Sequence, residues 1–276
     1  MVFRVLIALA LAGTLTFFAK AEPAVTWMLG DLPPFHIGGG PFAEQGIKDQ
    51  QQRFLADNLP QFTHQKVVAS ASRIWYDVEH RDGVCMIGIS RNTDRDKLVI
   101  FSQRAEKRRN IQALVVKRAN AGRFLPFADP EGLDLMRLAT SDSLRGAYIA
   151  AHIYSVPIRQ FLNDIDRRSQ LDQVPAMPAL FGLLGGDRVD FVFASSLEAA
   201  FFAEGQPYVA IWIKNTDRME DNYVACSIGP TGKAVIAAID RLFLDEAKWR
   251  AFTEPGQQWQ AAHPSVEFVG PRPVAP

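Results

Sequence analysis

The chain has 276 residues, of which 48% are hydrophobic and 22% are charged, a balance that excludes a disordered chain, a collagen and a coiled coil. Lys plus Arg and Asp plus Glu both number 30, so the formal net charge is zero. This argues against a binder of nucleic acid or of a charged membrane surface, and any affinity for charged ligands must come from local placement.

The first 21 residues have the features of an export signal. Arg4 gives a positive start, an unbroken apolar run follows over 5–11, and Ala19-Lys20-Ala21 supplies the small residues of a cleavage site. The alternative is an uncleaved membrane anchor, but this apolar run is short for a span of about 20 residues. We therefore predict cleavage after Ala21 and export of the mature chain.

The next part of the chain alternates strands and helices. The predicted elements are strands over 24–29, 65–69 and 84–89 and helices over 47–58 and 72–80. Pro33 and Pro34 end the first strand region, because proline cannot donate to a sheet ladder. The βαβαβ order predicts an α/β fold with a mainly parallel sheet flanked by helices.

The second half of the chain repeats this pattern. The predicted elements are strands over 111–116, 138–140, 189–194, 208–213 and 223–227 and helices over 147–162, 177–184, 197–203 and 232–262. We expect the helix over 147–162 to tolerate Pro157 or to kink there. The end of the chain, from Gly270, has the composition of a tail.

The last strand and its helices form a piece too small to stand alone, so we expect it to return to the first unit. The predicted organisation is a signal peptide over 1–21, lobe 1 over 22–108 and 222–276, and lobe 2 over 109–221. Two crossings between lobes make a hinge. The ligand site is then expected between the lobes, at the carboxyl ends of strands.

The two cysteines, Cys85 and Cys226, both lie in strand-like runs. In an oxidising compartment an even pair can be bridged, and closing so long a loop contributes up to about 5 kcal/mol in the chain-entropy picture. The alternative is two buried thiols that act as small hydrophobic side chains. The residues alone leave both interpretations open.

The most informative segment is Gly88–Ser102, with the sequence GISRNTDRDKLVIFS. Its Ser90, Arg95 and Lys97, followed by Phe-Ser, resemble the pattern Gly-x-(Ser/Thr)-x-Thr-x-x-Arg-x-Lys-x-x-x-Phe-Ser of the family 3 bacterial extracellular solute-binding proteins. The threonine is displaced by one position, to Thr93. Further likenesses follow in the family's order: the Pro-Pro-Phe after the first strand, the segment Gly186–Asp190, and the strand over 223–227 before a long helix.

The resemblance implies the two-lobe fold of periplasmic binding proteins of type II, of the amino-acid-binding kind. It implies a periplasmic monomer without cofactor or catalytic residues, which captures a small carboxylate-bearing ligand and delivers it to an ABC-type permease of the inner membrane. It also places the strands of Cys85 and Cys226 side by side in lobe 1, which favours a disulfide.

The resemblance assigns three site residues in lobe 1. Arg95 matches the arginine that holds the ligand carboxylate, a role suited to a planar and permanently charged guanidinium, and Ser90 would support the same carboxylate. The alternative for Arg95 is a surface ion pair with Asp94 or Asp96. Phe35 matches the aromatic residue that covers the ligand, although core packing is the commoner fate of a phenylalanine.

In lobe 2, Ser143 is expected to cap a helix whose free amide groups suit an anion. Arg145 is then a second anion clamp or a solvated residue of the first turn. Ser195 stands where the amino-acid binders carry the Asp that pairs with the ligand ammonium, and Asp31 or Glu198 could substitute for it. The missing acid favours an anionic or carboxylate-bearing ligand.

Two other functions remain open on the same scaffold. One is an enzyme such as a dehydratase or lyase, which would need a general acid or base in the cleft, for example Glu198 or Asp31. The other is a sensory module that reports its ligand to a membrane signalling partner. The five histidines show no metal-ligand spacing, so no metal site is expected.

Overall fold

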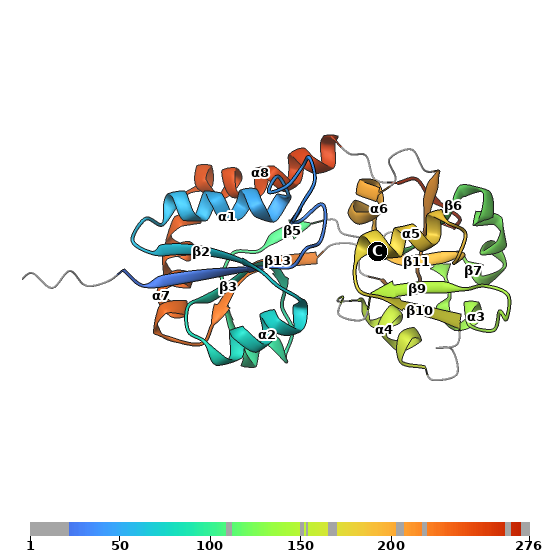
Figure 1. Cartoon of the computed structure of the whole chain (residues 1–276), viewed down its shortest axis with the longest axis horizontal. Coiled ribbons are helices and arrows are strands. Elements are labelled where there is room, and N and C mark those ends of the chain that lie inside the picture. Colours follow the sequence, from blue (N-terminus) through green and yellow to red (C-terminus); the bar gives the residue numbers. More distant parts are fainter. Residues whose placement is uncertain are drawn as a thin grey trace, which may run out of the picture.

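The chain folds into two lobes that lie side by side (Figure 1). This computed structural model describes residues 22–108, 112–149, 152, 154–164, 170–202, 207–216, 220–262 and 266–271. The predicted signal peptide, residues 1–21, lies outside the described residues. In the described part of the chain, every helix is too short or too polar to cross a membrane.

The first lobe is built on a six-stranded sheet in the order β2-β1-β3-β13-β4, with β5 also paired to β13. Its strands are β1 (Ala24–Leu29), β2 (Thr63–Val68), β3 (Val84–Ser90), β4 (Val99–Phe101), β5 (Glu106–Arg108) and β13 (Glu220–Ser227). Its helices are α1 (Ile47–Asn58), α2 (Ala71–His80), α7 (Pro230–Leu242) and α8 (Glu246–Ala262). β1 pairs in parallel with β2 and β3, and the returning β13 is antiparallel, so the predicted return to the first unit is confirmed for β13.

Helices cover both faces of this sheet, and the strand period of two sorts the residues between them. Trp27 and Ile87 pack with α1, α7 and α8 on one face. Met28 and Met86 pack with α2 on the other face. All four side chains are at most 2% exposed. The neighbouring strands β1 and β3 are therefore almost continuous apolar runs, as is typical of strands covered on both faces.

A disulfide joins Cys85 and Cys226 within the first sheet. The two residues face each other as register partners between β3 and β13. Both are fully buried. The bridge therefore ties the returning C-terminal part of the chain to the N-terminal part of the lobe, 141 positions earlier, and the bridged interpretation is confirmed.

The second lobe has its own six-stranded sheet in the order β10-β9-β11-β6-β12-β14. Its strands are β6 (Gln112–Lys117), β9 (Gly146–Ile149), β10 (Leu171–Val174), β11 (Phe191–Ser195), β12 (Tyr208–Trp212) and β14 (Phe268–Val269). Its helices are α3 (Leu135–Leu138), α4 (Val156–Asn163), α5 (Met177–Gly185) and α6 (Ser196–Phe202). The short strands β7 (Ala128–Asp129) and β8 (Gly132–Leu133) form a separate pair.

The segment over 135–163 differs from the prediction. The expected strand over 138–140 is wrong, because Asp134 caps a short helix there by accepting the amides of Met136 and Arg137. The expected helix over 147–162 is wrong over 147–149, which belong to strand β9. A Cβ at Gly146 would lie 2.3 Å from the ring of Phe191, which is too close for any side chain. Glycine therefore allows the backbone of β9 to pass directly beside this aromatic ring. The helix begins only at Val156, with Pro157 in its first turn.

The end of the chain crosses back to the second lobe, which was not predicted. β14 pairs in parallel with β12, and the buried Val266 joins the second lobe's core. The assignment of 222–276 to lobe 1 is therefore wrong beyond α8. The chain crosses between lobes after β5, after β12 and after α8, so three connections link the lobes in place of the two expected.

Candidate functional site: a cleft between the lobes

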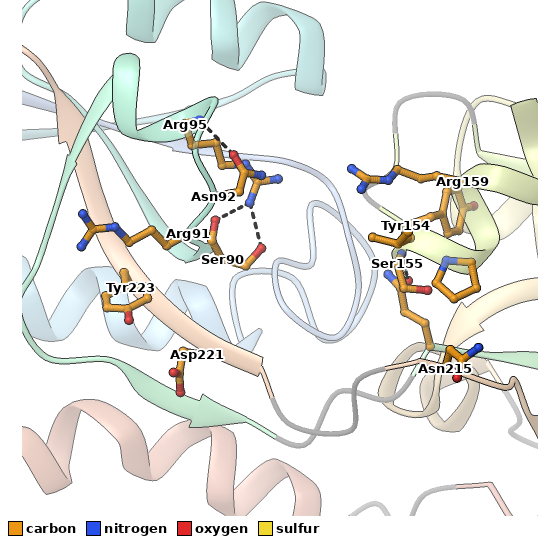
Figure 2. A pocket seen from close by; sticks show the side chains of 13 residues that line it. Ser90, Arg91, Asn92, Arg95, Tyr154, Ser155, Arg159, Asn215, Asp221 and Tyr223 are labelled. Atoms are coloured by element: carbon orange, nitrogen blue, oxygen red, sulfur yellow. Dashed lines mark hydrogen bonds between the residues drawn. The ribbon is translucent and has the colours of Figure 1, made fainter. Parts of the chain in front are cut away.

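A cavity of about 460 Å³ lies between the two lobes. The residues that line it from the first lobe are Ser90, Arg91, Asn92, Arg95, Asp221 and Tyr223. Those from the second lobe are Gln112, Tyr154, Ser155, Val156, Pro157, Arg159 and Asn215. Figure 2 shows the labelled residues of these two groups on opposite walls of the cavity. The two walls belong to different sheets, so any movement of one lobe against the other changes the cavity.

The wall in the first lobe is built at the carboxyl end of β3. Ser90 ends this strand, and the chain then turns through Asn92 into a 3₁₀ turn, Arg95–Lys97. The Asn92 side chain accepts the Arg95 amide at 2.9 Å and so fixes the start of the turn. The carboxyl end of a central strand is where α/β sheets place their ligands. The cavity therefore lies at the edge of the sheet where the strand order leads us to expect a ligand site.

Arg95 is held in place by the residues around it. Its guanidinium donates to the Ser90 hydroxyl at 2.8 Å and also to the Ser90 carbonyl. It lies 5.4 Å from the centre of the Trp75 ring, within the range of a cation–π contact. The residue is only 9% exposed. The alternative of a solvated Arg95 paired with Asp94 or Asp96 does not match these contacts.

Arg91, the next cation of this wall, has an acidic partner. Its Nε lies 2.7 Å from the Asp96 carboxylate, and its guanidinium lies over the Phe101 ring at 5.4 Å. Both members of the ion pair are partly exposed, so water screens the pair. Asp96 therefore places an opposite charge next to Arg91.

The wall in the second lobe is the amino-terminal turn of α4. Ser155 is the N-cap residue, and its amide donates to the Gln112 side chain at 2.6 Å. The Ser155 hydroxyl oxygen is buried and has no hydrogen-bond partner among the described residues. The first-turn amides of a helix have no partner inside the helix, and the helix dipole makes this end positive. The turn therefore offers donors and a positive potential to the cavity.

Two charged residues complete the cavity. Arg159 lies one turn further along α4, is exposed, and points toward the first lobe (Figure 2). Asp221 comes from β13 and is the only acidic residue among the described lining residues. Tyr154 is buried and accepts the Ile149 amide at 2.9 Å, and burial raises its pKa, so the phenol stays neutral. The described lining is therefore mainly polar, with an excess of positive charge.

Of the predicted site residues, the structure brings Ser90 and Arg95 together in the cavity. Phe35 lies elsewhere: it is 4% exposed and packs with Ile47 and with Leu197 of the second lobe. Its aromatic ring is thus part of the contact between the lobes. Asp31 is exposed and accepts the Gly38 amide at 3.1 Å, and it does not line the cavity.

Ser143 and Arg145 lie outside the cavity, because the helix that they were expected to begin is strand β9. Both residues precede the amino end of this strand, whereas its carboxyl end leads to the cleft and α4. The Arg145 guanidinium lies 3.4 Å from the Asp172 carboxylate and its amide donates to Asp190 at 2.9 Å. The helix start at the cleft is Ser155, twelve positions after Ser143.

Ser195 caps helix α6 and is only 1% exposed. Its amide donates to the Glu198 carboxylate at 2.6 Å, and its hydroxyl accepts the Glu198 amide at 3.2 Å. This reciprocal arrangement is a capping box. Glu198 is equally buried and lies 3.8 Å from the His152 ring. Neither residue lines the cavity, so Glu198 does not replace the missing acid there.

Sequence reasoning missed Arg159, Ser155, Gln112 and Asp221. One signal was available for the first two: Ser155-Val156-Pro157 is an N-cap residue followed by a proline in the first turn, which marks the start of a helix. Arg159 lies four positions after this cap residue and is the fourth residue of the helix, near its amino-terminal end. Asp221 had no local signal, because β13 reaches the cleft only through its pairing with β3 and β5.

Comparisons with known proteins agree with this architecture. No protein-family model matches the sequence, and no curated protein matches it. An amino acid ABC transporter substrate-binding protein from Streptococcus pneumoniae, solved with L-arginine bound, is 16% identical with a TM-score of 0.62, covering 89% of this chain and 96% of its own. A histidine kinase sensor domain with similarity to periplasmic binding proteins is 14% identical, with a TM-score of 0.62. The match covers 90% of this chain and 100% of the sensor domain.

A third solved structure is the ancestral amino-acid-binding protein AncCDT-1, a precursor of cyclohexadienyl dehydratase. It is 16% identical with a TM-score of 0.63, covering 86% of this chain and 95% of its own. The three proteins represent a transport receptor, a sensor and an ancestor of an enzyme, so the likeness concerns the fold and not one function. The chain has the two-lobe α/β fold of the type II periplasmic binding proteins.

Proposed function

We propose that this protein is an exported solute-binding protein that captures a small carboxylate-bearing ligand between its lobes. The single observation that carries the proposal is Arg95, a nearly buried guanidinium that Ser90 and Trp75 hold at the wall of an inter-lobe cavity. A planar, permanently charged group fixed in this way can meet a carboxylate with two parallel hydrogen bonds.

The opposite wall supports the same ligand chemistry. The first turn of α4 presents amide donors beside the buried Ser155 hydroxyl. A ligand that touches both Arg95 and this turn makes more contacts when the lobes are close together than when they are apart. Ligand binding therefore shifts the population toward the closed arrangement, since the closed state gains the extra contacts.

Asp221 is proposed to take the role that Ser195 leaves open. It is exposed and is the only acid among the described lining residues, so it is available to a ligand ammonium group. An α-amino acid would then place its carboxylate at Arg95 and its amine toward β13. The two acids considered for an enzyme, Glu198 and Asp31, lie outside the cavity, which favours binding over catalysis.

Delivery to an ABC-type permease is part of the proposal, as is export to the periplasm of a monomeric mature chain. The fold is shared with receptors of such transporters. Two observations test this part: permease and ATPase genes encoded beside this chain, and a periplasmic protein whose N-terminus begins at Glu22. An isolated gene beside a signalling kinase would point to the sensory alternative.

The binding test uses the purified mature protein in isothermal titration calorimetry with a panel of amino acids and small organic acids. Arg95→Ala is expected to weaken a bound carboxylate by about 3 kcal/mol, roughly a hundredfold in Kd, because it removes a nearly buried charged partner. Arg81→Ala, which removes an arginine of the same lobe outside the cavity, is the control. Equal affinities in wild type and Arg95→Ala would refute the proposal.

A further inference from the structure

Arg159 is a charged residue of the cleft that the proposed function has not used, and any role for it in ligand binding rests on that function. It lines the cavity from the second lobe and is exposed. Within the described part of the chain, its guanidinium makes no hydrogen bond, ion pair or ring contact. By contrast, Arg91 is paired with Asp96 and Arg145 lies beside Asp172. Arg159 is thus a cation at a ligand cavity with no acidic neighbour of its own among the described residues.

Its place on α4 increases the positive potential at this wall. Arg159 is the fourth residue of the helix, and its amide makes the first bond of the helix ladder, to the Ser155 carbonyl. A cation near a helix N-terminus is electrostatically unfavourable, because the dipole is already positive there. An anion bound beside Ser155 and Arg159 would remove this repulsion and gain from both charges.

The charge balance of the cavity points the same way. The described lining contains three arginines and one aspartate, and Asp96 offsets Arg91 from just outside. A ligand with one carboxylate at Arg95 and one ammonium at Asp221 would leave the charge of Arg159 without a counterpart. Since Arg95 and Arg159 lie on opposite walls of the cavity (Figure 2), one small anionic group does not serve both as well as two.

We propose that the ligand carries two anionic groups, one held by Arg95 in the first lobe and the other by Arg159 with the first turn of α4 in the second. The ligand class is therefore a small dicarboxylate or an acidic amino acid, and a sulfonate or phosphate satisfies the same chemistry as the second group. Arg159 acts as the residue that selects for this second charge.

The experiment compares matched pairs of ligands by calorimetry at constant ionic strength. L-glutamate is paired with L-glutamine, L-aspartate with L-asparagine, and glutarate with glutaramate, so that each pair differs only in the second charge. L-cysteate and O-phosphoserine, each against L-serine, test a sulfonate and a phosphate. Each titration is made on wild type, Arg159→Gln and Arg188→Gln. Arg188 is an exposed arginine of the second lobe outside the cavity, so its variant loses the same charge.

In wild type, the doubly charged member of at least one pair is expected to bind about tenfold more tightly than its neutral partner, the effect of one close charge pair in a partly wet cleft. Arg159→Gln should reduce this preference to within about twofold, with little change for the neutral partner, and Arg188→Gln should retain it. This combination supports the proposal.

Three other results overturn it. Equal or tighter binding of the neutral partners, still dependent on Arg95, refutes the second anionic group but leaves the proposed function standing. A preference for the charged partners that survives in Arg159→Gln refutes the role of this residue. If no member of the panel binds to wild type, the proposed function fails and this inference fails with it.

Discussion

Replacing Asp49 with asparagine should destabilise the first lobe strongly. This carboxylate is 2% exposed and sits at the start of α1. One oxygen lies 2.6 Å from Nδ1 of His36, and the other accepts the amides of Ile37 at 3.3 Å and Gly46 at 3.1 Å. These contacts fasten the loop that carries Phe35 to the helix behind it, and Phe35 in turn contacts the second lobe.

The size of the destabilisation follows from the hydrogen bonds that Asp49→Asn would lose. An asparagine side chain at this position keeps only one acceptor oxygen, and its NH₂ group cannot accept the hydrogen bonds of the oxygen that it replaces. When the NH₂ group faces the amides of Ile37 and Gly46, two hydrogen bonds to a charged group are lost at about 1.5 kcal/mol each, so we expect a loss of up to about 3 kcal/mol in the free energy of unfolding.

The effect should depend on pH in a defined direction. Burial alone would raise the pKa of the Asp49 carboxyl, but the contacts with His36, the Ile37 amide and Lys66 together lower it below its ordinary value. A lowered folded-state pKa means that the carboxylate stabilises the fold fully above its unfolded-state pKa of about 4. This contribution is lost as the pH falls through the lower folded-state value. The difference between wild type and Asp49→Asn should therefore shrink in acid.

The assay is urea unfolding followed by the fluorescence of the five tryptophans, at a series of pH values from neutral to acid. Asp31→Asn is the matched control, because this carboxylate lies in the same loop, is exposed and accepts a single amide. It should cost less than about 1 kcal/mol. If Asp49→Asn were no more destabilising than this control at neutral pH, the structural argument would be refuted.

Three further predictions concern the cleft, the disulfide and the contact between the lobes. Asp221→Asn should weaken an amine-bearing ligand about tenfold in calorimetry while its deaminated analogue is unaffected, and an equal loss for both would contradict the ammonium site. Replacing Cys85 and Cys226 together by alanine should lower the urea midpoint, with about 5 kcal/mol as the upper limit of the loss; an unchanged midpoint would count against the stabilising role. Leu197→Ala should cost about 2 to 4 kcal/mol by differential scanning calorimetry, since it empties a buried inter-lobe position, and no change in Tm would argue against that contact.

The local signals of the sequence were sufficient for most of the first lobe. β1 and α1 begin and end at the predicted residues. Their apolar periods are clear, and each is bounded by proline or by a residue that favours turns. The carboxyl end of β3 could also be predicted as part of the site, because the pattern around Arg95 is local and dense. Both Ser90 and Arg95 line the cavity between the lobes.

The sequence alone determined the α/β class, the return of β13 to the first lobe and the chemistry of one wall of the cleft. Only the tertiary structure decided that Cys85 and Cys226 face each other, that β14 crosses back to the second sheet and that Arg159, and not Arg145, faces the cavity. The reason is physical: strand pairing and lobe contact join residues far apart in the chain, and no local period encodes which partner they meet. Gly146–Ile149 becomes a strand because β11 and β10 supply its hydrogen bonds, and this in turn moves the helix start to Ser155.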